Sequence, residues 1–286
     1  MPWARRALAL GLVAVLGTAC SGRAETPEAG RLPSSDHVHA LRVLEDGTLL
    51  LGLHGALYRS SDGERWEPAG LEGRDAMAIG AHDPDGPIFV AGHEVLARSR
   101  DGGATFEDLR PSDLPGLDIH AFAQAPSAPE RIYAFVVGFG LFASEDAGET
   151  WALRAELGSV PPDLLALVVV GQGTELLMAA GPESGVLRSE DGGRTFARML
   201  NAGALSLAND PSDPDRLLGI TARGLEESRD GGRSWSVLLP RGEALPGQWI
   251  SVAVGPDGSA WVVTEEPRTL QRTRDGGRSW EEVARA

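Results

Sequence analysis

The sequence predicts an all-β fold in which six similar units, each of four antiparallel strands, form a ring: a six-bladed β-propeller. Three observations support this. A short Asp-Gly motif occurs six times along the 286 residues. Short apolar segments separated by turns precede every copy, and the chain is rich in turn formers, with 37 glycines and 19 prolines. A unit of about 40 to 45 residues is typical of a propeller blade.

The repeated motif has the chemistry of a tight turn. Its copies are SSDGERW, SRDGGATF, SEDAGETW, SEDGGRTF, SRDGGRSW and TRDGGRSW, with aspartates at Asp62, Asp101, Asp146, Asp191, Asp230 and Asp275. The aspartate can accept hydrogen bonds from nearby backbone N–H groups, and glycine adopts backbone angles that other residues avoid. The final Trp or Phe is expected to bury its ring against the sheet. The first copy is one residue shorter, which predicts a tighter or irregular turn.

Each unit reads as strand, turn, strand, turn, strand, Asp motif, strand, so the motif lies between the third and fourth strands. The predicted propeller covers residues 36–286, and its blades begin near His37, Asp75, Asp118, Asp163, Gly203 and Gln248. Only WEEVARA follows the last motif, enough for one outer strand. We therefore expect no strand exchange between the first and last blades, unless the N-terminal segment supplies a strand. A parallel β-solenoid is the structural alternative, but its repeats are usually shorter.

The N-terminus resembles a bacterial lipoprotein signal peptide over residues 1–19, with Arg5 and Arg6 before a short apolar run. The resemblance implies cleavage before Cys20, lipidation of that cysteine, and export to the cell envelope. The alternative is an ordinary secretory peptide with a chance cysteine. Ser21 resembles the pattern for outer-membrane sorting, if the cell is Gram-negative. Residues 20–35 lack apolar periodicity and predict a flexible tether, so the lipid would be the only membrane contact.

Charge and composition exclude several kinds of chemistry. The formal net charge is -15, which argues against nucleic-acid binding. All 26 basic residues are arginine, so lysine-based Schiff-base chemistry is excluded. A single cysteine excludes internal disulfides and thiolate zinc cages.

The six motifs resemble the Asp-box, or BNR, repeats of sialidases, sortilin-type receptor domains and photosystem II assembly propellers. The segments HVHAL and DIHAF, around His39 and His120, also resemble a bacterial group labelled glycosylhydrolases. The resemblance implies a propeller fold over nearly all of residues 36–286. It leaves function open, because such repeats occur in both enzymes and binding proteins.

The histidines point to one candidate site. All six lie in the first half of the chain. In a four-stranded meander, the start of the first strand and the turn between the second and third strands lie at the same end. That end should gather His37, His39, His54, His93 and His120 with Asp75, Asp118 and Asp163, and residues two apart, such as Asp118 and His120, share a face. His82 belongs to the opposite end.

Two interpretations of this cluster remain open. Imidazoles with carboxylates suit copper or zinc, and the proposed ligands are His37, His39, His54, His93, His120 and Asp118. Alternatively, histidines on inner strands bond to channel water and neighbouring backbone. In the metal interpretation the protein is a binding or assembly module, with a protein, metal or glycan ligand at the mouth of the ring.

A glycoside hydrolase is the alternative function, since glycosidases need two nearby carboxylates. The candidate catalytic residues are Asp75, Asp118, Asp163 and Glu183. A typical sialidase is disfavoured, because the FRIP-like segment is missing and the only tyrosines are Tyr58 and Tyr133. Trp249 and Trp261 are expected in the core rather than as sugar-stacking platforms.

Overall fold

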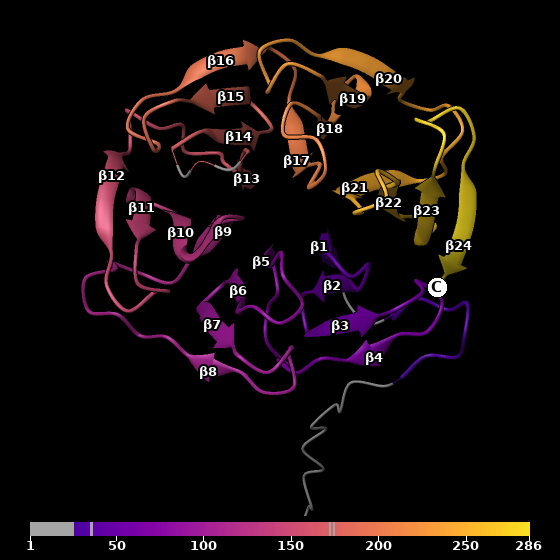
Figure 1. The fold of residues 1–286 in the computed structure, drawn as a ribbon, viewed down its shortest axis with the longest axis horizontal. Helices are drawn as coiled ribbons and strands as arrows, with labels where there is room; N and C mark the ends of the chain where they lie inside the picture. Colours follow the sequence, from indigo (N-terminus) through magenta and orange to yellow (C-terminus); the bar gives the residue numbers. More distant parts are fainter. Residues whose placement is uncertain (1–25, 35–36, 172, 174) are drawn as a thin grey trace, which may run out of the picture.

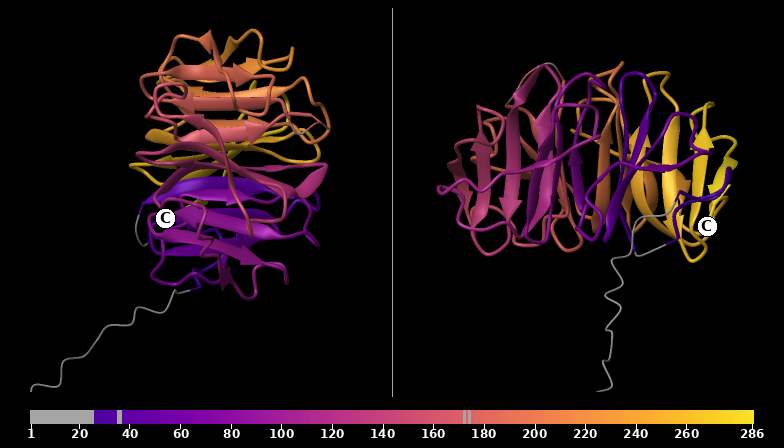
Figure 2. Two further views of the ribbon diagram at one scale, coloured as in Figure 1. Left: turned by 90° about the vertical axis from the view of Figure 1, so that its left-hand side faces the viewer. Right: turned by 90° about the horizontal axis from the view of Figure 1, so that it is seen from below.

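The computed structural model describes residues 26–34, 37–171, 173 and 175–286. Within these residues the chain forms six antiparallel four-stranded sheets, and in each sheet the strands follow sequence order from the inside of the ring outwards. No helix in this part of the chain is long and apolar enough to span a membrane. The sheets are arranged as blades around a central axis (Figure 1), and their strands run across the thickness of the disk (Figure 2). The predicted six-bladed propeller is confirmed.

The strands of the first three blades are β1 (Val38–Val43), β2 (Leu49–Leu53), β3 (Ala56–Ser60), β4 (Glu67–Pro68), β5 (Ala78–Gly80), β6 (Ile88–Gly92), β7 (Val95–Ser99), β8 (Glu107–Asp108), β9 (Ile119–Ala125), β10 (Ala128–Val136), β11 (Gly140–Ser144) and β12 (Ala152–Glu156). Those of the last three are β13 (Ala166–Val169), β14 (Leu177–Gly181), β15 (Gly185–Ser189), β16 (Ala197–Leu200), β17 (Ala204–Asn209), β18 (Leu217–Thr221), β19 (Gly224–Ser228), β20 (Ser236–Pro240), β21 (Gln248–Val254), β22 (Ala260–Glu265), β23 (Thr269–Thr273) and β24 (Glu281–Arg285).

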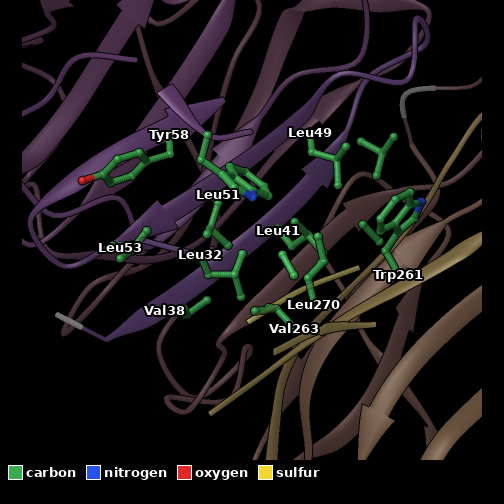
Figure 3. Close-up of a cluster of buried hydrophobic side chains, with 14 of the residues drawn as sticks. Leu32, Val38, Leu41, Leu49, Leu51, Leu53, Tyr58, Trp261, Val263 and Leu270 are labelled. Carbon is green, nitrogen blue, oxygen red and sulfur yellow. The ribbon is translucent and has the colours of Figure 1, made fainter. Parts of the chain in front are cut away.

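The middle strands are apolar on both faces because every blade packs against two neighbours. All residues of β2, β6, β14 and β18 are buried, so these strands read as continuous hydrophobic runs rather than as an alternating pattern. Between the first and last blades, Leu51 and Tyr58 belong to one buried cluster with Trp261, Val263 and Leu270 (Figure 3). The outer strands are the most exposed of each blade, and β8 consists of only two residues, both exposed.

The Asp motif forms the turn between the third and fourth strands, as predicted. In the second copy, the N–H of Gly103 donates to Ser99 Oγ at 2.8 Å, and the N–H and hydroxyl of Thr105 donate to the two oxygens of Asp101 at 2.9 and 2.6 Å. In the shorter first copy the bond to the serine hydroxyl comes from Gly63, three residues after Ser60 rather than four. The predicted tighter turn is therefore present.

We expect acid to weaken these turns. The hydroxyl groups of Thr105 and Ser234, followed by backbone N–H groups, lower the pKa of Asp101 and Asp230 from 3.8 to about 2. A folded-state pKa below the unfolded value adds stability that is present above about pH 4 and lost as the pH falls towards about 2. The thermal unfolding midpoint, followed by circular dichroism, should fall across this window, and the fall should be smaller for Asp230→Asn. A midpoint that does not change there would contradict this role of the carboxylates.

The segment before the first blade contacts the last blade. Arg31 forms a parallel bridge with Arg285, and the N–H of Leu32 donates to the carbonyl of Arg285 at 3.0 Å. Leu32 is 2% exposed and belongs to the cluster between the first and last blades. The segment thus supplies a backbone pairing with the last blade that the sequence left open, and Leu32 is its buried contact. The predicted leader, Cys20 and the beginning of the tether lie outside the described residues.

Candidate functional site

The candidate site is built at the end of the ring where the first strands begin. The innermost strands, β1, β5, β9, β13, β17 and β21, surround the axis (Figure 1). His39 and His120 lie on β1 and β9, and His54 and His93 lie in the turns after β2 and β6. Asp118 directly precedes β9 of the third blade, and Asp75 lies three residues before β5 of the second blade. The prediction that strand polarity brings these scattered residues together is supported by the contacts described below.

Both strand histidines are extra residues in β-bulges. The pairing of β1 with β2 passes from Val38 to Ala40 and skips His39, and the pairing of β9 with β10 skips His120 in the same way. A bulge leaves one residue outside the regular ladder and changes the direction of its side chain. The bulges therefore give these two imidazoles a direction that the regular alternation of side chains along a strand does not predict.

The first group of possible ligands, called trio one, consists of His39, His54 and Asp75. Asp75 Oδ1 lies 3.4 Å from His39 Nε2 and 3.6 Å from His54 Nδ1. One ligand atom from each of these residues lies within 4.8 Å of the others. The Asp75 side chain is only 4% exposed, whereas the His54 side chain is 57% exposed. Trio one thus has a buried carboxylate and an open side.

The second group, called trio two, consists of His93, Asp118 and His120. Asp118 Oδ1 lies 3.1 Å from His120 Nε2 and 3.7 Å from His93 Nε2. Ligand atoms from these residues also lie within 4.8 Å of one another. Each trio offers two imidazole nitrogens and one carboxylate oxygen, a donor set that suits zinc or copper and leaves further coordination positions open.

Four polar atoms of the two trios are buried without a hydrogen bond and lie in pairs, 3.4 Å apart in trio one and 3.1 Å apart in trio two. They are His39 Nε2, Asp75 Oδ1, Asp118 Oδ1 and His120 Nε2, and none has a hydrogen-bond partner in the described part of the chain. An unsatisfied buried polar group costs about 1–3 kcal/mol. In each trio this imidazole nitrogen and this carboxylate oxygen face one another, so a cation between them could coordinate both atoms.

The two trios are joined by two hydrogen bonds between His93 and Asp75. His93 Nδ1 lies 2.6 Å from Asp75 Oδ2, which also accepts the backbone N–H of His93 at 3.3 Å. A proton on Nδ1 leaves the lone pair of the neutral ring on Nε2, which faces Asp118. Burial lowers the pKa of His39, so its ring stays neutral and able to bind a cation.

Three of the predicted residues belong to neither trio. His37 is exposed and contributes its backbone carbonyl, which accepts the N–H of His54 at 3.0 Å. Asp163 Oδ2 accepts the N–H groups of Glu183 and Ser184 at 2.6 and 2.9 Å, so it stabilises a turn. Glu183 is exposed on that turn. These residues lie at the predicted end of their blades, but their side chains belong to neither trio, although the sequence analysis expected His37 and Asp163 in the cluster and His37 among the metal ligands.

Asp75 belongs to trio one, although it was not among the metal ligands expected from the sequence. The available signal was its position, since it precedes the second blade as Asp118 precedes the third. Met77 occupies in the second blade the position that His39 and His120 occupy in theirs. Met77 and His39 also line the same axial cavity, of about 70 Å³, together with Arg42.

Other predicted placements agree with the structure. His82 lies between β5 and β6, at the opposite end of the blade, where its Nε2 is 3.0 Å from the carbonyl of Gln124. Burial, and then the charge of Arg42, lowers the pKa of His82 to about 3. Trp249 and Trp261 are 1% and 5% exposed and belong to the core, as expected.

Comparisons with known proteins identify the fold. No family model and no curated protein matches the chain. Among solved structures, the extracellular domain of a hybrid two-component system from B. thetaiotaomicron is similar with a TM-score of 0.60 at 14% identity, over 91% of this chain and 37% of that one. The GH74 xyloglucanase from Xanthomonas campestris gives 0.59 at 18%, over 90% and 46%. YCF48 bound to a D1 peptide gives 0.51 at 16%, over 72% and 66%.

The chain is a β-propeller. At these identities the likeness extends to the fold alone. This chain spans less than half of the xyloglucanase and of the two-component domain, and about two thirds of YCF48.

Proposed function

We propose that this protein is a lipid-anchored, exported Asp-box propeller that acts as a binding or assembly module. Its working surface is the mouth of the ring formed by trio one and trio two, and it binds copper or zinc there. The observation that carries this proposal is the set of four buried nitrogen and oxygen atoms that face one another without hydrogen-bond partners among the described residues. A bound cation would satisfy these atoms and leave open coordination positions for a ligand.

A binding role is in keeping with the propellers that resemble this one. YCF48 was solved with a D1 peptide, and another similar chain is an extracellular domain. In this proposal the partner is a protein or a glycan that contacts the mouth, and lipidation at Cys20 holds the propeller at the cell envelope. The acidic charge of the chain argues against nucleic acid as the partner.

We expect the full chain, purified without a histidine tag, to retain copper or zinc in at least stoichiometric amount. The double variant His39→Ala/His120→Ala should lose it, because each trio then lacks one imidazole. Elemental analysis after desalting measures this. His82→Gln is the matched control, since His82 lies at the other end of the blade.

A glycoside hydrolase is the second candidate, favoured by the likeness to GH74 enzymes and by the carboxylates Asp75 and Asp118 on either side of His93. A wild-type chain that retains no metal and cleaves a panel of aryl glycosides, with cleavage abolished by Asp118→Asn, would reverse the order of the two proposals.

A further inference from the structure

We infer that the mouth of the ring binds two cations, one in each trio, and that Asp75 joins the two sites. This inference rests on the proposed metal-binding function and specifies its stoichiometry and arrangement. It follows from the way the six side chains are distributed, and it assigns different tasks to the two oxygens of Asp75.

The two trios share a pair of ligands that is built in the same way from neighbouring blades. Each combines the histidine of a turn between the second and third strands with the aspartate that precedes the next blade. These pairs are His54 with Asp75, and His93 with Asp118. A histidine from a bulged first strand completes each trio, but it comes from the blade of the turn histidine in trio one (His39) and from the blade of the aspartate in trio two (His120). The propeller repeat has therefore produced the same turn-histidine and aspartate pair twice, and the two bulged strands add one imidazole to each pair.

The geometry gives a row of ligands rather than one cage. The ring centroids of His39 and His54 are 5.9 Å apart, those of His54 and His93 are 6.4 Å apart, and those of His93 and His120 are 5.2 Å apart. Within each trio the ligand atoms lie close enough to share one ion. Three ligands per ion is the usual number for a site that also holds water or a partner group.

Asp75 contributes to both sites without sharing a ligand atom. Its Oδ1 faces His39 and His54, and this buried oxygen has no hydrogen-bond partner in the part of the chain described. Its Oδ2 is 2.6 Å from His93 Nδ1. A carboxylate that accepts the other N–H of a ligating histidine fixes its tautomer and orientation and strengthens it as a ligand. Asp75 is therefore a ligand in trio one and a positioning residue for trio two.

The test uses the two exposed turn histidines, because their replacement leaves the strands intact. The side chains of His54 and His93 are 57% and 49% exposed. The full chain without a tag is loaded with Zn²⁺, desalted and analysed for bound zinc, and Co²⁺ gives an independent absorption readout of nitrogen and oxygen coordination. Wild type should hold two equivalents. His54→Ala and His93→Ala should each hold one, and the double variant should hold none.

His37→Ala is the matched control, since it removes an exposed imidazole from the same end of the ring but from neither trio. It should keep two equivalents. One equivalent in the wild type would overturn the two-site inference and leave the proposed function in place. No bound metal in the wild type would overturn both. Thermal unfolding of each variant, compared with wild type, separates lost ligands from lost fold.

Discussion

Replacing Arg216 with methionine is expected to lower the free energy of unfolding by about 3–5 kcal/mol. Its Nη1 is 2.8 Å from Asp210 Oδ2 and its Nε is 2.9 Å from Glu227 Oε1. All three side chains are less than a tenth exposed. Methionine fills a similar volume but has no charge, so the buried Asp210 would lose its cation and the buried Glu227 would keep only the exposed Arg229. Denaturant unfolding followed by tryptophan fluorescence measures the loss.

The same arginine links two blades, which adds to the expected effect. Its Nη1 also donates to the carbonyl of Gly258, in the loop between β21 and β22 of the last blade, at 2.8 Å. Arg233→Met is the control, because Arg233 is 61% exposed and lies 4.0 Å from Glu190. Exposed ion pairs contribute about 0–1 kcal/mol, so this control should remain close to wild type. Equal small losses in both variants would show that burial does not decide the strength of the Arg216 network.

The fold could be predicted from the sequence because the turn chemistry is repeated. Each Asp motif defines the end of a third strand, and the apolar runs before it define the two inner strands. Six copies together leave few alternatives to a ring of blades. The contact of Leu32 with the last blade was harder to predict, since a single buried leucine in a segment without periodicity gives no pattern.

The site was predicted less completely, for a physical reason. Strand polarity is a property of the whole unit, so it correctly gathered His39, His54, His93 and His120 at one end. The contacts made at the start of a strand depend on β-bulges, which change the direction of a side chain. They also depend on whether a residue contributes its backbone carbonyl or its side chain. His37 uses its carbonyl, whereas Asp75 uses both carboxylate oxygens, and the sequence does not distinguish these cases.

The second large effect is expected at Asp75. Asp75→Ala should abolish tight metal binding in trio one and weaken binding in trio two by about 10–100-fold, the usual cost of removing a group that orients a ligating histidine. In trio one the variant removes the buried Oδ1 next to His39 and His54, and in trio two it removes the hydrogen bond to His93 Nδ1. Competition against a chromogenic zinc chelator measures the affinity of both sites.

Asp163→Ala provides the control for this experiment. Asp163 holds the same position before the fourth blade and stabilises the equivalent turn, but it belongs to neither trio. It should lose stability without losing metal. Asp75→Asn keeps an oxygen that can accept the proton of His93 Nδ1 while it removes the charge from trio one, so trio two should recover most of its affinity. Unchanged affinity of trio two in Asp75→Ala would mean that His93 is oriented by other contacts, and equal metal loss in Asp163→Ala would assign the effect to the fold.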